Sequence, residues 1–219
     1  MVVIISPAIK LIRKSFGRIE EDFRNIDLKR DKFFAFLIKK YWPRFIQPNY
    51  ITIARILIAL IIGGILLAGY ELNLILLIII YFLCLFSDLI DGSVARTLNM
   101  KTKIGGFLDP LADKLLQIII AIYLLWSNHF ILLAVLGLLE ITTAWGSVIL
   151  YLIGYSVEAN AFGKVKMFLQ SVAFLVLLLP LGQNTNQVAI LLLWIAVFFA
   201  IASLTVQAWH KYFQHFYED

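Results

Sequence analysis

The sequence predicts an all-α integral membrane protein, in which six transmembrane helices follow an N-terminal amphipathic helix at the membrane interface. Composition is the first reason: 62% of the 219 residues are hydrophobic, only 15% are charged, and the mean hydropathy is +0.90. A soluble domain of this length needs a much more polar surface. The second reason is that the apolar residues gather into separate runs, each long enough to cross a bilayer.

The N-terminal segment, residues 1–48, has the pattern of an amphipathic helix. Between residues 6 and 31, apolar side chains recur at alternating intervals of three and four, which places them along one helix face. Residues 33–42 are aromatic and basic, a composition typical of the headgroup region. Prolines then interrupt the helix. We therefore predict a cytoplasmic juxtamembrane segment, followed by a six-helix transmembrane domain over residues 49–219.

Six hydrophobic segments make up this second part of the chain. They lie at about residues 51–69, 73–97, 105–126, 129–153, 163–181 and 187–209. Each can span a hydrocarbon core that is roughly 30 Å thick. Cys84 is the one cysteine of the sequence, so neither an intrachain disulfide nor a cysteine-based metal site is expected.

The distribution of lysine and arginine predicts the orientation of these segments. The loops after the first, third and fifth segments contain neither residue, whereas the other loops and the N-terminal tail contain nearly all of them. Under the positive-inside rule, both termini of this multi-pass protein are cytoplasmic and the chain resides in the cell membrane. Because the basic residues flank apolar spans, we expect membrane lipids, and not nucleic acid, as their partner.

Charged and small residues are concentrated at the cytoplasmic end of the second segment. At about 100° per residue, Asp88, Asp91 and Arg96 fall within one arc of roughly 140°, together with Gly92 and Ala95. Glycine and alanine leave room for a bulky headgroup to approach the backbone, and an arginine can pair with a phosphate. This face therefore suits a phosphorylated ligand.

The third segment begins with two more acids, Asp109 and Asp113, which lie four residues apart and so share a face. The linker 97–104 is short enough to fold the two helices antiparallel, so that four carboxylates meet. Burying each charge in a membrane costs about 2.5–3.5 kcal/mol even on lenient scales. Two divalent cations would neutralise the acids and still accept a phosphate, and ligation by oxygen alone favours Mg²⁺ or Mn²⁺.

Interhelical ion pairs and ion transport are the alternatives to a catalytic metal site at these acids. Ion pairs alone do not account for the acids, because Arg96 and Lys114 cannot balance four carboxylates placed so close together. A cation transporter is the alternative from another functional class. Transporter sites usually lie near the bilayer midplane at broken helices, whereas these acids lie at helix ends beside a cytoplasmic loop. The arrangement favours an enzyme that acts at the membrane surface.

The spacing Asp-x2-Asp-Gly-x2-Ala-Arg-x8-Gly-x3-Asp-x3-Asp, from Asp88 to Asp113, resembles the signature of the CDP-alcohol phosphatidyltransferases. The resemblance extends from about Pro48 to Gln170 and includes the motifs that open the first and fifth segments. It implies six transmembrane helices, a homodimer and a divalent-metal site near the cytoplasmic face. The implied reaction is displacement at the β-phosphate of CDP-diacylglycerol by a polar alcohol, which releases CMP.

The resemblance also implies roles for individual residues. Asp88, Asp91 and Asp109 correspond to metal ligands, and Asp113 to a ligand or, more importantly, the general base that takes the hydroxyl proton. Gly92, Ala95 and Arg96 of the signature correspond to the pocket for the CDP group. Asn49 and Thr52 correspond to residues near the nucleotide. The metals and the arginine would stabilise charge on the pyrophosphate.

These patterns define the acceptor alcohol less well than the donor. The Asp109–Lys114 stretch and the motif that opens the fifth segment resemble bacterial phosphatidylglycerophosphate synthases, whose acceptor is glycerol 3-phosphate. Arg55, Lys164 and Lys166 are then candidates for binding its phosphate. Glu140, an acid within the fourth segment, is expected to brace Arg55 or one of these lysines.

One departure from those synthases leaves other acceptors open. Their fourth span carries an arginine before the glutamate and another seven positions after it, where this chain has Leu139 and Ser147. Cardiolipin synthases, which use phosphatidylglycerol, share the Asp-Pro-x-Ala-Asp-Lys type of ending, and enzymes that use inositol phosphate share the core signature. Serine is a further alternative.

Overall fold

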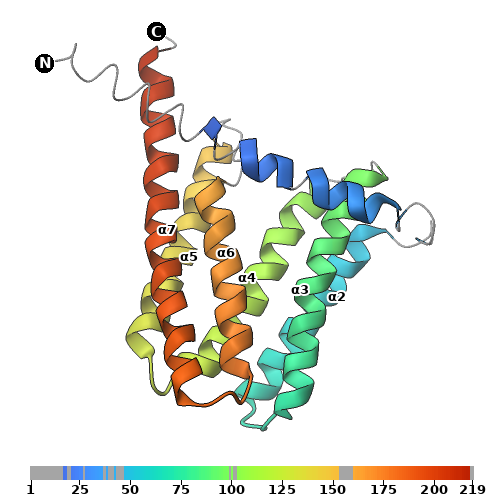
Figure 1. Cartoon of the computed structure of the whole chain (residues 1–219), viewed down its shortest axis with the longest axis vertical. Coiled ribbons are helices and arrows are strands. Elements are labelled where there is room, and N and C mark those ends of the chain that lie inside the picture. The colour runs from blue at the N-terminus through green and yellow to red at the C-terminus, as the bar shows by residue number, and fades with distance from the viewer. Residues whose placement is uncertain are drawn as a thin grey trace, which may run out of the picture.

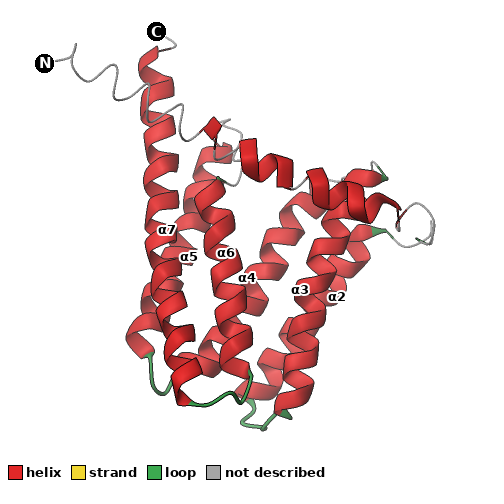
Figure 2. Cartoon of the chain, viewed as in Figure 1, coloured by secondary structure: helices red, strands yellow, loops and turns green. Residues whose placement is uncertain are grey.

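The computed structural model of the chain describes residues 17–18, 21–26, 28–36, 38, 42, 47–98, 100, 103–152 and 160–217. Every regular element within these ranges is a helix (Figure 2). In chain order, the six long helices are α2 (Pro48–Leu67), α3 (Leu74–Thr97), α4 (Lys103–Leu125), α5 (Phe130–Leu152), α6 (Ala161–Leu178) and α7 (Gln183–Tyr217).

The six helices form a bundle in which α2, α3 and α4 occupy one side and α5, α6 and α7 the other (Figure 1). Helix α2 packs against α3 and α4, α6 packs against α7, and α4 and α3 both contact α6 across the middle. Helical residues 21–26 and 28–36 lie across the end of the bundle where α3 ends and where α4 and α6 begin (Figure 1). These two helical stretches, together called the N-terminal helix, therefore lie over the end of the bundle that contains the predicted site.

Local sequence explains where several helices begin and end. Pro48 opens α2, a position where its missing N–H is not needed. The side-chain oxygen of Asn73 caps α3 by accepting hydrogen bonds from the next backbone N–H groups at 2.9 and 3.3 Å. Gly69 (φ 77°) and Gly182 (φ 96°) take left-handed conformations in the turns after α2 and α6. These turns return the chain directly into the next helix.

The interior of the bundle is apolar along most of its length. Core residues from five helices are Ala59, Leu77, Ile120, Leu125, Phe174 and Leu193. Large apolar side chains are also exposed on the outer faces, among them Ile61, Phe82, Ile131, Leu138 and Phe198. Apolar surface this extensive is unfavourable in water and suits contact with lipid. The fold class predicted from composition, an all-helical membrane protein, is confirmed.

Within the described residues, four helices are long and apolar enough to cross a membrane: α2, α3, α6 and α7. Helix α5 has a shorter apolar stretch, Phe130–Gly146, and α4 carries the acids of the predicted site near its start. The count of six spans therefore stays a prediction. Helix positions agree with the predicted segments to within a few residues, except that α7 continues to Tyr217. The first part of the predicted amphipathic helix lies outside the described residues.

Candidate active site

Three aspartates of the predicted site contact one buried arginine. Arg55 lies two turns into α2, and its side chain is 2% exposed. Its Nη1 lies 2.7 Å from Oδ1 of Asp88 and 2.8 Å from Oδ1 of Asp113, and its Nη2 lies 3.1 Å from Oδ2 of Asp91. One guanidinium thus joins α2 to acids of both α3 and α4. Helices α3 and α4 run antiparallel, as predicted from the short linker, but each packs on α2, and Arg55 of α2 brings their carboxylates together.

The fourth aspartate is bound one turn nearer the end of the bundle. Thr52 donates its hydroxyl proton to Oδ1 of Asp109 at 2.7 Å, and Thr52 is itself buried. Because Thr52 and Arg55 are three residues apart, they lie on the same face of α2. We call the four aspartates at 88, 91, 109 and 113, with Arg55 and Thr52, the aspartate cluster.

The aspartate cluster has more negative than positive charge. It contains four carboxylates and one guanidinium, and the carboxylate of Asp91 is only 3% exposed. Hard divalent cations bind sets of oxygen donors that carry such excess charge, so the chemistry of the donor set fits them. In the described part of the chain, however, no three acidic, histidine or cysteine side chains are arranged as a ready metal site. Three of the carboxylates are instead turned toward Arg55, and that of Asp109 is turned toward Thr52.

Gly92 gives the side chain of Arg96 a place to lie against its own helix. A Cβ atom added at Gly92 would lie 3.4 Å from Nη1 and 3.5 Å from Nη2 of Arg96. The guanidinium therefore lies over Gly92, which is one turn earlier in α3. Gly92 directly follows Asp91 of the aspartate cluster. Ala95 is half-buried beside it. The small residues of the signature thus lie directly around its arginine.

An acid of the N-terminal helix, Asp31, contacts Arg96. Its Oδ2 accepts from Nε of Arg96 at 2.5 Å, and its Oδ1 accepts from Nη2 at 2.8 Å and from the hydroxyl of Ser93 at 2.9 Å. Partial burial tends to raise the pKa of this carboxyl, but the hydrogen bonds from Arg96 and Ser93 outweigh burial and lower the pKa below its usual value. Asp31 is thus ionised at neutral pH.

A second ionic group lies between α5 and α6. Lys166 donates to Oε1 of Glu140 at 2.5 Å, and Gln170, one turn further along α6, donates to the same oxygen at 3.4 Å. All three residues are buried. The sequence predicted that Glu140 braces either Arg55 or a lysine. In the structure Glu140 pairs with Lys166, whereas Arg55 pairs with the aspartates.

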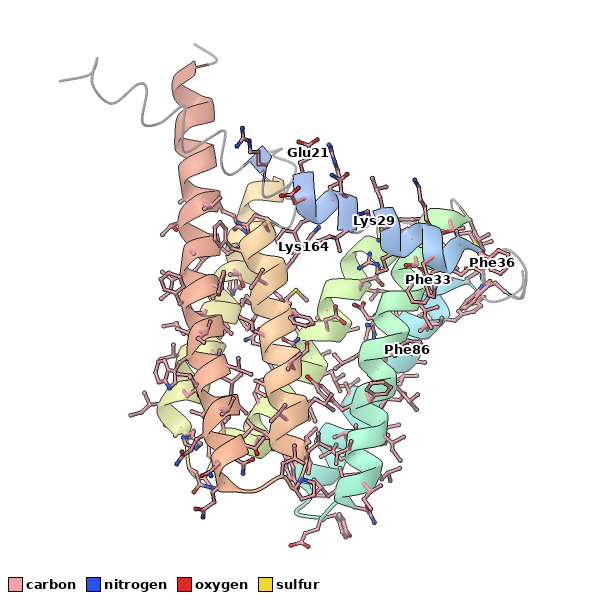
Figure 3. The ribbon with its side chains drawn as sticks, in the orientation of Figure 1. Glu21, Lys29, Phe33, Phe36, Phe86 and Lys164 are labelled. Atoms are coloured by element: carbon pink, nitrogen blue, oxygen red, sulfur yellow. The ribbon has the colours of Figure 1, made fainter. Side chains whose placement is uncertain are left out.

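The remaining predicted residues lie at the same end of the bundle. Asn49 is in the first turn of α2, close to Thr52 in sequence, and is half-buried. Lys164 is near the start of α6, beneath the N-terminal helix (Figure 3). The side chain of Ser147, where related synthases have an arginine, lies outside the described residues.

A model of the CDP-alcohol phosphatidyltransferase family matches residues 45–202, which is more than half of the chain. The chain belongs to this family. It is therefore an enzyme, a transferase of the CDP-alcohol phosphatidyltransferase type. The resemblance drawn from the spacing of the aspartates is confirmed.

Relatives of this phosphatidyltransferase carry a common name. The CDP-diacylglycerol--glycerol-3-phosphate 3-phosphatidyltransferase of Bacillus subtilis (strain 168) is 34% identical over 181 residues, which cover 71% of this chain and 90% of the relative. The protein of that name from Rickettsia felis is 34% identical over 178 residues, with 76% and 93% covered. The Aquifex aeolicus protein of that name is 32% identical over 134 residues, with 58% and 72% covered.

Three residues near the site of this phosphatidyltransferase were not predicted from the sequence. They are Asp31, Ser93 and Gln170. Ser93 lies inside the signature, and its place between the two aspartates and the arginine could have suggested a polar role. No sequence pattern pointed to Asp31, because its partner Arg96 lies 65 residues further along the chain.

Proposed function

We propose that this phosphatidyltransferase transfers a phosphatidyl group from CDP-diacylglycerol to glycerol 3-phosphate, releasing CMP, as a step of membrane phospholipid synthesis. The observation that carries the proposal is the aspartate cluster, in which acids from α3 and α4 surround a buried arginine at one end of the bundle. The names of the relatives from Bacillus subtilis and Rickettsia felis support glycerol 3-phosphate as the acceptor.

Asp88, Asp91, Asp109 and Asp113 would bind the divalent ions, Mg²⁺ or Mn²⁺ and two in number. When bound, such ions neutralise charge on the pyrophosphate of the donor. The excess of carboxylates over the single guanidinium of Arg55 supports this assignment. Arg55 itself offsets part of the repulsion between the acids, and Thr52 orients the carboxylate of Asp109 through its hydroxyl.

Asp113 would act as the general base. The acceptor hydroxyl oxygen attacks the β-phosphorus of CDP-diacylglycerol while Asp113 takes the hydroxyl proton. The bond between the β-phosphorus and the bridging oxygen breaks, and CMP leaves with the electron pair. Because Arg55 donates to Oδ1 of Asp113 at 2.8 Å, the carboxylate has a fixed orientation, with Oδ2 as the remaining oxygen.

The donor pocket would be built from Gly92, Ala95 and Arg96 of α3, with Asn49 and Thr52 of α2 near the nucleotide. The guanidinium that lies over Gly92 supports this assignment, since it is a cation beside a surface without a bulky side chain. An arginine can bind two phosphate oxygens at once, which orients the pyrophosphate as well as attracting it.

The acceptor phosphate would be bound by basic residues at the start of α6, Lys164 and Lys166, with Arg55 at the border of the donor site. Glu140 supports the assignment of Lys166, because the pair fixes a buried ammonium group in one position. Since the two arginines of related synthases are absent, these lysines would supply more of the positive charge. Phosphatidylglycerol, inositol phosphate and serine are the alternative acceptors.

We further propose that the enzyme works as a homodimer in the cell membrane, with both termini and the active site cytoplasmic. The turns at Gly69 and Gly182, which contain no lysine or arginine and lie opposite the end that carries the site, support this orientation. Residues 1–48 would form a juxtamembrane segment and residues 49–219 the catalytic domain. The N-terminal helix that lies across the site end of the bundle supports this division.

Release of CMP from CDP-diacylglycerol tests the proposed function. The full chain in lipid nanodiscs is supplied with Mg²⁺ or Mn²⁺ and, in parallel, with glycerol 3-phosphate, phosphatidylglycerol, inositol phosphate or serine. We expect CMP release and a phosphatidylglycerophosphate product, identified by mass spectrometry, with glycerol 3-phosphate alone. Product with another acceptor would overturn the acceptor assignment. No CMP with any acceptor, together with Mg²⁺ or Mn²⁺ flux into vesicles, would instead favour a cation transporter.

A further inference from the structure

The N-terminal helix reaches the family signature through the side chain of Asp31. Its two carboxylate oxygens pair with Nε and Nη2 of Arg96, at 2.5 and 2.8 Å, in the bidentate geometry that is the strongest form of this ion pair. The hydroxyl of Ser93, which is fully buried in α3, donates to Oδ1 of the same carboxylate at 2.9 Å. Three hydrogen bonds thus bind one acid of the N-terminal helix to the end of α3.

The acid of this contact is more buried than other acids of the N-terminal helix. The side chain of Asp31 is 16% exposed and that of Arg96 is 36% exposed. By contrast, Glu21 and Asp22, acids earlier in the same helix, are exposed, and Glu21 points away from the bundle (Figure 3). The helix therefore directs one particular acid toward the signature.

The pairing fixes the orientation of the guanidinium. Asp31 binds the edge formed by Nε and Nη2, and both terminal nitrogens lie over Gly92, with Nη1 3.4 Å and Nη2 3.5 Å from where a Cβ atom would be. Since a guanidinium is planar, fixing one edge also fixes the direction of Nη1. The guanidinium is thus held over Gly92, the residue that follows Asp91 in α3. An arginine without this partner would sample many rotamers at the exposed end of the helix.

We propose that Asp31 is a positioning residue for the donor site, which orients Arg96 so that its guanidinium receives the pyrophosphate of CDP-diacylglycerol. Asp31 lies outside residues 45–202, the part that matches the family model. The N-terminal helix thus supplies a functional side chain to a site whose other members belong to the matched domain. This inference rests on the proposed role of Arg96 in donor binding.

Steady-state kinetics of the Asp31→Asn variant test the inference. Asparagine keeps the size of the side chain but loses the charge and one of the paired oxygens. In nanodiscs with saturating glycerol 3-phosphate, we expect the KM for CDP-diacylglycerol to rise about tenfold, because misdirected charged hydrogen bonds cost roughly this factor. The kcat and the KM for glycerol 3-phosphate should stay within about twofold, since Arg96 orients the donor only.

Two further variants separate positioning from a general effect. Asp31→Glu keeps the paired carboxylate and should recover most of the donor KM. Glu21→Gln removes the same charge from an exposed position of the same helix and should leave the donor KM unchanged. Titration calorimetry with CDP should show weaker binding by the Asp31→Asn variant, in proportion to the rise in KM, with no weakening in the Glu21→Gln variant.

The outcomes distinguish this inference from the function on which it rests. An unchanged donor KM in a folded Asp31→Asn variant overturns the inference, and so does a lower donor KM, which would mean that Asp31 competes with the phosphate. If Asp31→Asn fails to fold, Ser93→Ala removes one hydrogen bond to the same carboxylate, and an unchanged donor KM in that variant overturns the inference. Absence of CMP release by the unmodified enzyme refutes the proposed function, while CDP calorimetry still tests Asp31.

Discussion

Among single residues, Arg55 has the largest electrostatic role in the aspartate cluster. Its guanidinium contacts carboxylates of three aspartates from a position that is 2% exposed. Buried charges that lose a partner are strongly destabilising, because the remaining charges stay in a medium of low polarity. Arg55 therefore stabilises the packing of α2 against α3 and α4 as well as the geometry of the acids.

Replacing Arg55 tests this role. Arg55→Gln should lower the unfolding free energy in chelated buffer by about 3–5 kcal/mol, the usual cost of breaking a buried ion pair. Mg²⁺ or Mn²⁺ should raise the Tm of this variant more than that of the unmodified chain, because cations replace the missing charge. Chemical unfolding in chelated buffer measures the first effect, and differential scanning fluorimetry with and without metal measures the second. Arg24→Gln, at an exposed position, is the control, and an equal response to metal in both variants would contradict the prediction.

The proposed general base can be tested separately from binding. Asp113→Asn should lower kcat by about 10²–10⁴-fold, the usual contribution of a positioned base. Binding of CDP, measured by calorimetry, should change much less. Glu71→Gln, an exposed residue in the turn before α3, serves as a control for loss of an acid. Turnover by Asp113→Asn above a tenth of the unmodified rate would assign the base elsewhere.

The sequence contains enough information to place the four aspartates at the same end of two successive antiparallel helices, because helical phase and a short linker determine which way their side chains face. It does not determine what each acid contacts. The position of Arg55 among the acids depends on how α2 packs against α3 and α4. The pairing of Asp31 with Arg96 depends on how the N-terminal helix docks on α3, although the two residues are 65 positions apart in sequence. Both are tertiary contacts that no local pattern encodes.

Among the helices, α5 and α6 are linked by a buried ionic pair. Glu140 and Lys166 lie 2.5 Å apart, with Gln170 contributing to the same carboxylate oxygen. Gln170 also has a buried amide oxygen without a hydrogen-bond partner. A group of this kind fixes the register of the two helices, since sliding either helix by one turn would separate the charges.

A double-mutant cycle tests the pair. Glu140→Gln and Lys166→Met should each lower stability by about 3–5 kcal/mol, because each leaves one buried charge without its partner. The double variant should be more stable than the sum of the two losses implies, since it leaves neither charge. Chemical unfolding in detergent micelles gives the three values. Strictly additive losses would show that the two side chains act independently.

Helix positions follow from hydropathy, and the predicted segments agree closely with α2 to α6. The prediction ended the last segment near residue 209, where the apolar run stops, whereas α7 continues to Tyr217. A hydropathy pattern locates the part of a helix that lipid surrounds, but a helix can continue into water once its backbone hydrogen bonds are formed. The extra turns project beyond the rest of the bundle (Figure 1).

At the scale of the whole molecule, orientation in the membrane can be tested by labelling. Glu71→Cys, in the exposed turn before α3, should react with a membrane-impermeant maleimide on intact cells. Glu21→Cys, in the N-terminal helix, should react only after the cells are permeabilised. Cys84 is buried, so background labelling should be low. Labelling of both positions from outside, or of neither, would contradict the predicted orientation.

The tight turns at one end of the bundle also bear on how the chain enters the bilayer. The connections between α2 and α3, α4 and α5, and α6 and α7 are each four to six residues long and contain no lysine or arginine. Each pair of helices could therefore insert as a hairpin during synthesis, with only a few polar groups passing through the hydrocarbon layer. Since α6 and α7 pack closely, and α2 contacts α3, at least two hairpins could form their internal contacts before the next is made. Asp88 and Asp91 would then meet Arg55 within the first hairpin, whereas Asp109 and Asp113 would join the aspartate cluster only when the second hairpin docks on the first.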